Sequence, residues 1–70
     1  QQNDENAIVY YYLGVAYQQQ QNWNEVVNNA NKAIELSQTF KQAYELAALA
    51  YEQMGNAQAA QQYRQAASQL

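Results

Sequence analysis

The chain repeats itself at an interval of 34 residues, and this feature constrains the fold more than any other. When the sequence is shifted by that interval, aromatic residues meet aromatic residues and small residues meet small ones. A repeat of this length corresponds to one supersecondary unit used twice, and such units bury a shared core by stacking. The aligned pairs are Tyr10 with Tyr44, Gly14 with Ala48, Ala16 with Ala50, Tyr17 with Tyr51, Asn22 with Asn56, Ala33 with Ala67, and Leu36 with Leu70.

Within each unit, apolar residues recur with the period of an α-helix. Four segments show this pattern, at about 7–20, 23–36, 40–54 and 57–70. Proline is absent and alanine is abundant, which also favours helices. Because the connections are short, consecutive helices must lie antiparallel. The sequence therefore predicts an all-α chain of four antiparallel helices in two helical hairpins.

Polar residues that cap helices stand before each expected helix. Their side chains accept hydrogen bonds from the free N–H groups of the first turn, and a Glu or Gln three residues later strengthens the signal. Gly55 is expected to end the third helix, because glycine adopts positive φ without strain. The expected caps are Asp4 or Asn6, Asn22 with Glu25, Thr39 with Gln42, and Asn56.

The pattern within each unit resembles the tetratricopeptide repeat. Members of that family carry an aromatic residue, a Leu-Gly pair and a tyrosine on the first helix of each repeat. Four positions differ from the family pattern. Gln21 takes the turn position that Gly55 holds in the second copy, and Gln38 replaces the usual exit proline. Ala30 stands where the second helix often has an aromatic residue, and Tyr63 falls one place early for that aromatic. The matching residues are Tyr10, Leu13-Gly14 and Tyr17 in the first copy, and Tyr44, Ala47-Ala48 and Tyr51 in the second.

This resemblance implies an α-α superhelix, of which the chain would be a fragment. It divides the sequence into a leader at 1–6, a first repeat at 7–40 and a second repeat at 41–70. Since the chain does not start with methionine, we expect it to be a piece of a longer protein.

A stripe on the first helix is expected to pack within the hairpin. Its residues follow the spacing of one helix face, and Gly14 would let the partner helix approach closely. Of the three consecutive tyrosines at 10–12, this stripe makes Tyr10 the packed one. The predicted structural residues are Tyr10, Leu13, Gly14, Tyr17, Ala33, Tyr44, Ala48 and Tyr51.

A second stripe on the first and third helices is the candidate partner-binding site. The family resemblance implies that these helices line a concave groove, where an apolar strip with a polar rim would bind a peptide or helix. Alternatively, Ile8, Tyr11 and Tyr12 cover a neighbouring repeat. The glutamates can hold a basic partner residue or form a solvated acidic face, with Lys41 neutralising Glu45. The groove residues are Ile8, Tyr11, Val15, Gln18, Gln42, Glu45, Leu49 and Glu52.

One side of the fourth helix is predicted to serve self-association. It carries Ala60, Tyr63, Ala67 and Leu70, and no later helix in the sequence could cover it. Two repeats with few large aliphatic residues should be only marginally stable. The alternative function is thus a structural element that stacks on further repeats or on a second copy, as a homo-oligomer.

The composition excludes several function classes. The net charge is −3 with three basic residues, which disfavours nucleic acid and anionic membranes. Histidine and cysteine are absent, and no nucleophile has a base beside it, so we expect no catalytic residue, no metal, no cofactor and no enzyme activity. The expected partner is a protein or peptide that is apolar, with a basic residue as an option. The compartment stays open, with the cytoplasm favoured.

Overall fold

The computed structural model describes residues 4–70, which form four α-helices and, within that range, no strand. The all-α prediction is confirmed. The first helix starts three residues before the expected position, so residues 4–6 of the predicted leader are helical, whereas residues 1–3 lie outside the described residues. The helices are α1 (Asp4–Gln19), α2 (Trp23–Leu36), α3 (Lys41–Gln53) and α4 (Ala57–Ser68).

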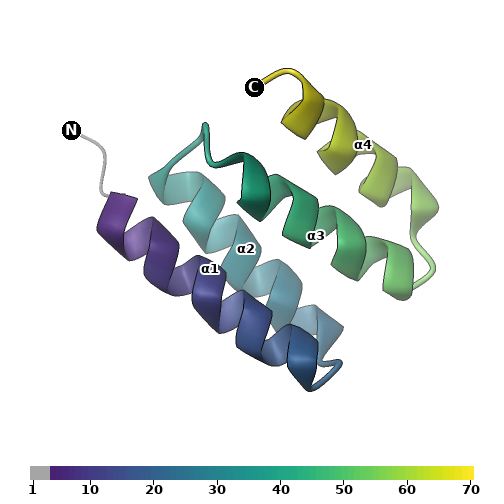
Figure 1. Cartoon of the computed structure of the whole chain (residues 1–70). Coiled ribbons are helices and arrows are strands. Elements are labelled where there is room, and N and C mark those ends of the chain that lie inside the picture. Colours follow the sequence, from purple (N-terminus) through teal and green to yellow (C-terminus); the bar gives the residue numbers. More distant parts are fainter. Residues whose placement is uncertain (1–3) are drawn as a thin grey trace.

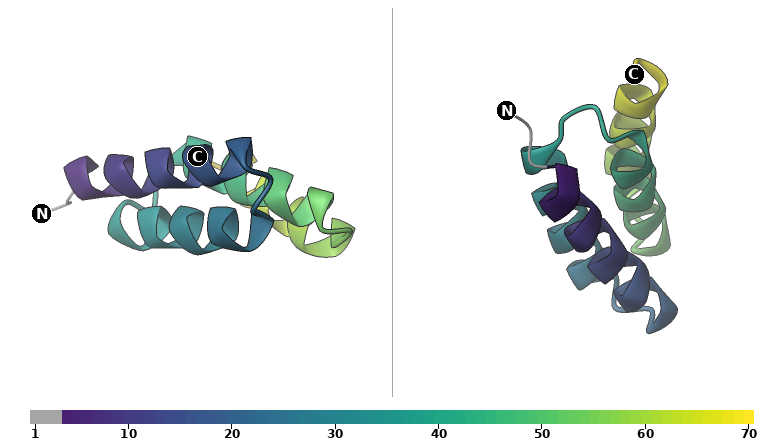
Figure 2. Two further views of the ribbon diagram at one scale, coloured as in Figure 1. Left: turned by 90° about the horizontal axis from the view of Figure 1, so that it is seen from below. Right: turned by 60° about the vertical axis from the view of Figure 1, so that its left-hand side comes forward.

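The helices form a row of two packed pairs. α1 packs on α2 and α3 packs on α4, while α2 and α3 join the pairs and α1 also contacts α3. Figure 1 shows α1 and α4 at opposite ends of the row, and the left view in Figure 2 shows α1 lying over α2. The Cα atoms extend over 36 × 27 × 12 Å, so the protein is a flat slab. Its core lies between the helices, and the outer sides of α1 and α4 form its two ends.

The turns inside the two pairs share the two hydrogen bonds that end the helix, displaced by 34 residues. In each, a residue with positive φ ends the helix, Gln21 at 60° and Gly55 at 82°. This is the Schellman arrangement, in which two backbone N–H groups satisfy the last free carbonyls of the helix. In the first turn Gln21 N donates to Gln18 O (2.9 Å) and Asn22 N to Tyr17 O (3.0 Å); in the second Gly55 N donates to Glu52 O (3.0 Å) and Asn56 N to Tyr51 O (2.9 Å).

Only one of the expected side-chain caps is present. Asn56 Oδ1 accepts from Ala59 N at 3.2 Å, which confirms that cap. Asn22 precedes α2 but its side chain makes no capping bond. The prediction for Thr39 is wrong, because Phe40 precedes α3 with its ring held against Tyr11.

The cap predicted for α1 is also wrong, for a different reason. Asp4 and Asn6 both lie inside the helix rather than before it, since α1 already begins at Asp4. A residue within the helix has helical backbone angles and cannot take the extended conformation of a cap.

Alanine dominates the core, and the helices therefore approach closely. The larger cluster joins Val26, Val27 and Ala30 of α2 to Leu46, Ala47 and Ala50 of α3, and the smaller joins Ala7, Ala33 and Ala43. Gly14 is buried at the crossing of α1 with both, where an added Cβ would lie 2.8 Å from Leu46 Cδ2 and 3.6 Å from Val26 O. As expected, Ala33 and Ala48 are fully buried, and Tyr10, Tyr17, Tyr44 and Tyr51 are half-buried.

Two predictions about the first helix need correction. Leu13 was expected to be packed, but it is 43% exposed. α2 and α3 contact α1 on the sides that carry Gly14 and Tyr11, and no described helix covers the side that carries Leu13. Tyr10 does pack, with Lys32 Nζ 5.5 Å from its ring centre, but Tyr11 packs as well and contacts both core clusters. Of the three tyrosines, only Tyr12 is mainly exposed.

We predict that Gln21→Gly stabilises the protein by about 1 kcal/mol, because a side chain at positive φ is strained and glycine is not. Urea unfolding followed by circular dichroism measures the change. Gln20→Gly is the matched control, since Gln20 has no positive φ and should gain nothing. Equal effects of the two substitutions would contradict the turn geometry.

We predict that Gly14→Leu destabilises the fold by about 3 kcal/mol, because the added atoms would run into Leu46 and the α2 backbone. Gly14→Ala should have a small effect, since its Cβ meets only the movable end of Leu46 and alanine favours the helix. Gln19→Leu adds the same side chain at an exposed position of α1 and serves as control. Parent-like stability of Gly14→Leu would show that the assigned helix register is wrong.

Candidate functional site

A hollow between α1 and the start of α3 is the candidate site. It has a volume of about 420 Å³ and is lined by Ile8, Tyr11, Tyr12, Phe40 and Gln42. A smaller hollow of about 200 Å³ adjoins it and shares Ile8 and Phe40. The first hollow thus combines four apolar or aromatic side chains with one amide, and it carries no charged residue.

Three aromatic rings shape this hollow. The Tyr11 ring centre lies 5.2 Å from that of Phe40, tilted by 44°, and 5.6 Å from that of Tyr12, at 61°. Tyr11 also packs into the core, so its ring is held in place from below. Tyr12 is 64% exposed and offers most of its ring to the solvent. A ring held in place by the core, next to an accessible ring, suits a binding surface, because little side-chain entropy is lost when a partner binds.

The structure brings together only part of the predicted groove stripe. Ile8, Tyr11 and Gln42 line the hollow, with Ile8 44% exposed. Val15, Gln18 and Leu49 are half-buried, whereas Glu45 and Glu52 are exposed. Glu52 pairs with Arg64 of α4, and Glu45 lines a hollow together with residues of α4. The predicted stripe therefore divides into an apolar part near α1 and an acidic part near α4.

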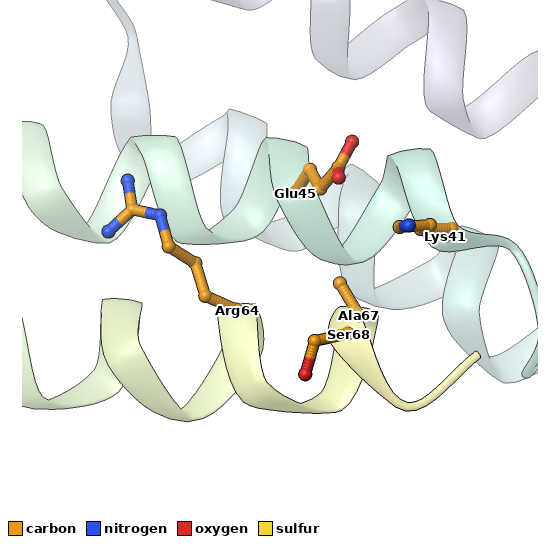
Figure 3. A pocket seen from close by; sticks show the side chains of 5 residues that line it. All are labelled: Lys41, Glu45, Arg64, Ala67 and Ser68. Carbon is orange, nitrogen blue, oxygen red and sulfur yellow. The ribbon is translucent and has the colours of Figure 1, made fainter.

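The acidic part is partly neutralised from within the chain. Arg64 of α4 forms an ion pair with Glu52 at 2.7 Å, and both side chains are about half exposed. Another hollow, separate from the two next to α1, lies beside this ion pair. It has a volume of about 460 Å³ and is lined by Lys41, Glu45, Arg64, Ala67 and Ser68. Figure 3 shows the Glu45 carboxylate pointing away from α4, and Arg64 extending away from Lys41. Glu45 is thus the glutamate of the two that is left to attract a basic residue of a partner.

The predicted self-association surface on α4 is instead used inside the protein. Ala60 and Ala67 are 1% and 3% exposed, and Tyr63 is half-buried against Tyr51, with ring centres 5.3 Å apart. The prediction is wrong for these residues because the apolar stripe of α4 is what packs α4 onto α3. Leu70 is half exposed but lies beyond the end of the helix.

Tyr63 also anchors α4 to α2. Its hydroxyl donates to Asn31 Oδ1 at 2.8 Å, beside a hollow of about 240 Å³ between these two helices. Burial raises the pKa of the Tyr63 phenol above its ordinary value of 10.0, and the neighbouring Tyr51 raises it further. The ring of Tyr44 also lies near that of Tyr63, with 6.4 Å between the ring centres. The cluster therefore favours the neutral phenol and holds the second pair together.

Phe40 is a site residue that the sequence analysis missed. The repeat offered no signal, because its counterpart one repeat earlier is Asn6. Tyr12 lay outside the predicted stripe because it is a further 100° around the helix from Tyr11. A usable signal would have been a large aromatic residue immediately before a helix, and here its ring packs against Tyr11 of α1 and the smaller core cluster.

Two searches of the described residues bear on chemistry. Among residues 4–70, no group of three or more His, Cys, Asp or Glu side chains is placed to hold a metal ion. None of the described helices combines the length and the apolar character that a membrane crossing demands. Comparison of the chain with known protein families, with curated proteins and with solved structures gives no match. What the surface does has to be argued from its geometry.

We predict that the free energy of unfolding falls as pH rises from about 10 through the folded-state pKa of Tyr63. The sign follows because the pKa is raised on folding, so the unfolded chain releases this proton first. Tyr63→Phe should show a shallower decline, and should cost about 1 kcal/mol at neutral pH through the lost Asn31 bond. Urea unfolding at several pH values measures both effects.

The exposed Tyr12 supplies the control for this experiment. Tyr12→Phe removes a phenol that is mainly in solvent, so it should keep the parent's pH dependence. A decline as steep in Tyr63→Phe as in the parent would contradict the role assigned to Tyr63.

Proposed function

We propose that this chain is a protein–protein interaction module of the tetratricopeptide type, which binds a peptide or helix of a partner on the face shared by α1 and α3. The observation that carries the proposal is the aromatic hollow lined by Ile8, Tyr11, Tyr12, Phe40 and Gln42. Apolar side chains that stay accessible on one face, next to polar ones, are typical of surfaces that bury a partner.

The repeated turns support the family part of the proposal. In each hairpin, the first helix ends in the same type of hydrogen-bonded turn, and the two turns are 34 residues apart. Tandem copies of one repeat unit would give this arrangement. In such a unit, successive first helices lie side by side on a concave surface, and α1 and α3 do contact each other. The superhelical arrangement belongs to this proposal, because two repeats are too few to define the curvature.

The chemistry of the hollow indicates the ligand. Its walls suit an aliphatic or aromatic side chain, and tyrosine is a favoured anchor at protein interfaces. Glu45 is exposed on the same helix as Gln42, three residues further on, and can attract a basic residue beside the apolar one. We infer a partner segment that pairs an apolar anchor with a lysine or arginine.

Binding rather than catalysis is what these groups can support. The hollow offers phenols, an amide and apolar carbon, and it places no carboxylate beside a hydroxyl to act as its base. The alternative function, a structural element that associates with a second copy, is supported by a different surface, the outer side of α1.

We predict that selection from a phage-displayed random peptide library enriches peptides with an aliphatic or aromatic residue close to a lysine or arginine. Ile8→Ser should weaken binding of a selected peptide about tenfold, because Ile8 lines both adjoining hollows. Val9→Ser is the matched control, because Val9 is the next residue on α1, is 55% exposed and lines neither of these hollows. Fluorescence anisotropy measures the affinities.

Glu45→Gln tests, in the same assay, whether the basic residue of the peptide contributes to binding. Binding should weaken several-fold and lose part of its salt dependence, since an exposed charge contributes mainly by long-range attraction. Equal loss in Ile8→Ser and Val9→Ser, or no enrichment of any motif, would refute the proposed site.

A further inference from the structure

α1 is apolar on all its sides, which sets it apart from the other helices. Of the six large hydrophobic residues that are exposed in residues 4–70, four lie on α1: Ile8 (44%), Val9 (55%), Tyr12 (64%) and Leu13 (43%). Ala16 is exposed as well. We use the outer face of α1 to mean Val9, Tyr12, Leu13 and Ala16, which lie at the spacing of one helix side. A helix that is hydrophobic all round is normally buried all round.

The opposite end of the row has the opposite character. On α4, every exposed residue after Ala57 is polar, namely Gln58, Gln61, Gln62, Arg64, Gln65 and Ser68. Figure 1 shows that α1 and α4 are the two outermost helices. A polar outer helix is how a stack of helical repeats ends in solvent. The outer side of α4 is therefore polar, whereas the outer side of α1 presents uncovered apolar surface.

We propose that the outer face of α1 binds the same face of a second copy of this chain, forming a two-fold symmetric dimer in which the two α1 helices run antiparallel. The outer face shares Tyr12 with the peptide-binding hollow, but Val9 and Leu13 line neither of the hollows next to α1. Substitutions at Leu13 therefore test the dimer separately from peptide binding.

The polarity of α4 decides between the ways in which copies can associate. Head-to-tail stacking would set the outer face of α1 against the glutamines and Arg64 of the next copy, and bury polar groups without partners. The same face on both copies matches apolar surface with apolar surface. Such a contact is closed by its two-fold axis and stops at two copies.

Side-chain sizes on the outer face fit an antiparallel pair. With the axis between Tyr12 and Leu13, Val9 lies opposite the partner's Ala16, so a larger side chain meets a small one. Tyr12 lies opposite the partner's Leu13, an aromatic ring on an aliphatic chain. Facing large and small residues lets two helices interdigitate closely.

Charge also favours this orientation. The outer face itself carries no charged residue, so its four side chains bring no like charges together. In a parallel pair each residue meets its own counterpart, and Glu5 would face a second Glu5 across the contact. In the antiparallel pair Glu5 lies near the uncharged glutamines at the end of the other helix, and the two helix dipoles oppose each other.

The size of the contact sets its strength. α1 has 16 residues and is about 24 Å long, and only one side of it is used. Stable interfaces bury about 800 Å² on each partner, which is more than four side chains of one helix supply. We therefore expect a weak dimer whose population depends on protein concentration.

The test is sedimentation equilibrium over about a hundred-fold range of concentration. The apparent mass should rise from 8.0 kDa towards twice that value and go no further. Leu13→Glu should lower the association constant at least about tenfold, since it brings two negative charges together near the axis. Because Leu13 is already 43% exposed, the helical circular dichroism of the Leu13→Glu variant should match that of the parent protein.

Two further variants make the test sharper. Leu13→Lys alone should also be monomeric, while an equimolar mixture of Leu13→Glu and Leu13→Lys should associate again, because opposite charges then face each other. Ile8→Ser lies on the hollow side and should dimerise like the parent. Restored association in the mixture cannot arise from a folding defect in either variant.

Disulfide cross-linking measures the relative orientation of the two α1 helices. The chain contains no cysteine, so only the introduced cysteines can react. A mixture of Val9→Cys and Ala16→Cys should form a disulfide between chains faster than Val9→Cys alone, because antiparallel helices bring these two positions within disulfide reach. Faster cross-linking of Val9→Cys alone would refute the antiparallel pair.

The mass measurements can overturn the proposal in two ways. A mass of 8.0 kDa throughout the concentration range would exclude the dimer, and growth beyond two copies would show head-to-tail stacking. Peptide binding is measured separately, and Leu13→Glu should retain it. The dimer and the peptide-binding function can therefore fail independently.

Discussion

The close approach of three helices at Gly14 is the constraint on which the rest of the structure depends. The space that a Cβ would need is already taken by Leu46 of α3 and approached by the α2 backbone. Around this point the buried residues are mostly alanine, so the helices are held by many short contacts and not by large interlocking side chains. Van der Waals attraction falls off steeply with separation, and a core of this kind therefore tolerates little displacement of one helix against the next.

The same constraint places several large residues of α1 on the outside. Because an added Cβ at Gly14 would run into Leu46, the innermost positions of α1 are small, as Ala7 and Gly14 are. Of the bulky residues, Tyr11 packs against the core at the edge of the aromatic hollow, whereas Ile8, Val9, Tyr12 and Leu13 stay exposed. Ile8 and Tyr11 lie on the side of the hollow, Val9 and Leu13 lie on the outer face, and Tyr12 belongs to both. A single helix thus contributes to two adjoining surfaces, because only Ala7 and Gly14 of its described residues are buried.

How far the sequence predicts this structure depends on how many helix faces are apolar. The positions of all four helices, apart from the start of α1, followed from the 3.6-residue period and from signals such as Gly55 and Asn56, since those signals are local. The rotation of α1 could not be derived in the same way, because a helix with apolar residues on every side has no preferred side in its pattern. Leu13 was therefore assigned to the interior, and Phe40, which has no repeat counterpart, was not recognised as a site residue.

The wrong prediction for α4 has a different physical origin. The way in which this helix actually packs explains how the second pair is held to the rest of the protein. α4 has one apolar stripe, and the sequence alone does not say whether this stripe packs on α3 or faces outward. Packing inward buries Ala60 and Ala67 and brings Tyr63 to Asn31, which joins α4 to α2 as well as to α3. A chain of 70 residues buries a small share of its surface, and an alanine core adds little per residue. Any polypeptide that covers the accessible apolar side of α1 binds only the folded state and so stabilises it. If a partner or a second copy binds there, its association is linked to folding, because burying the apolar surface of α1 adds to the stability of the folded state.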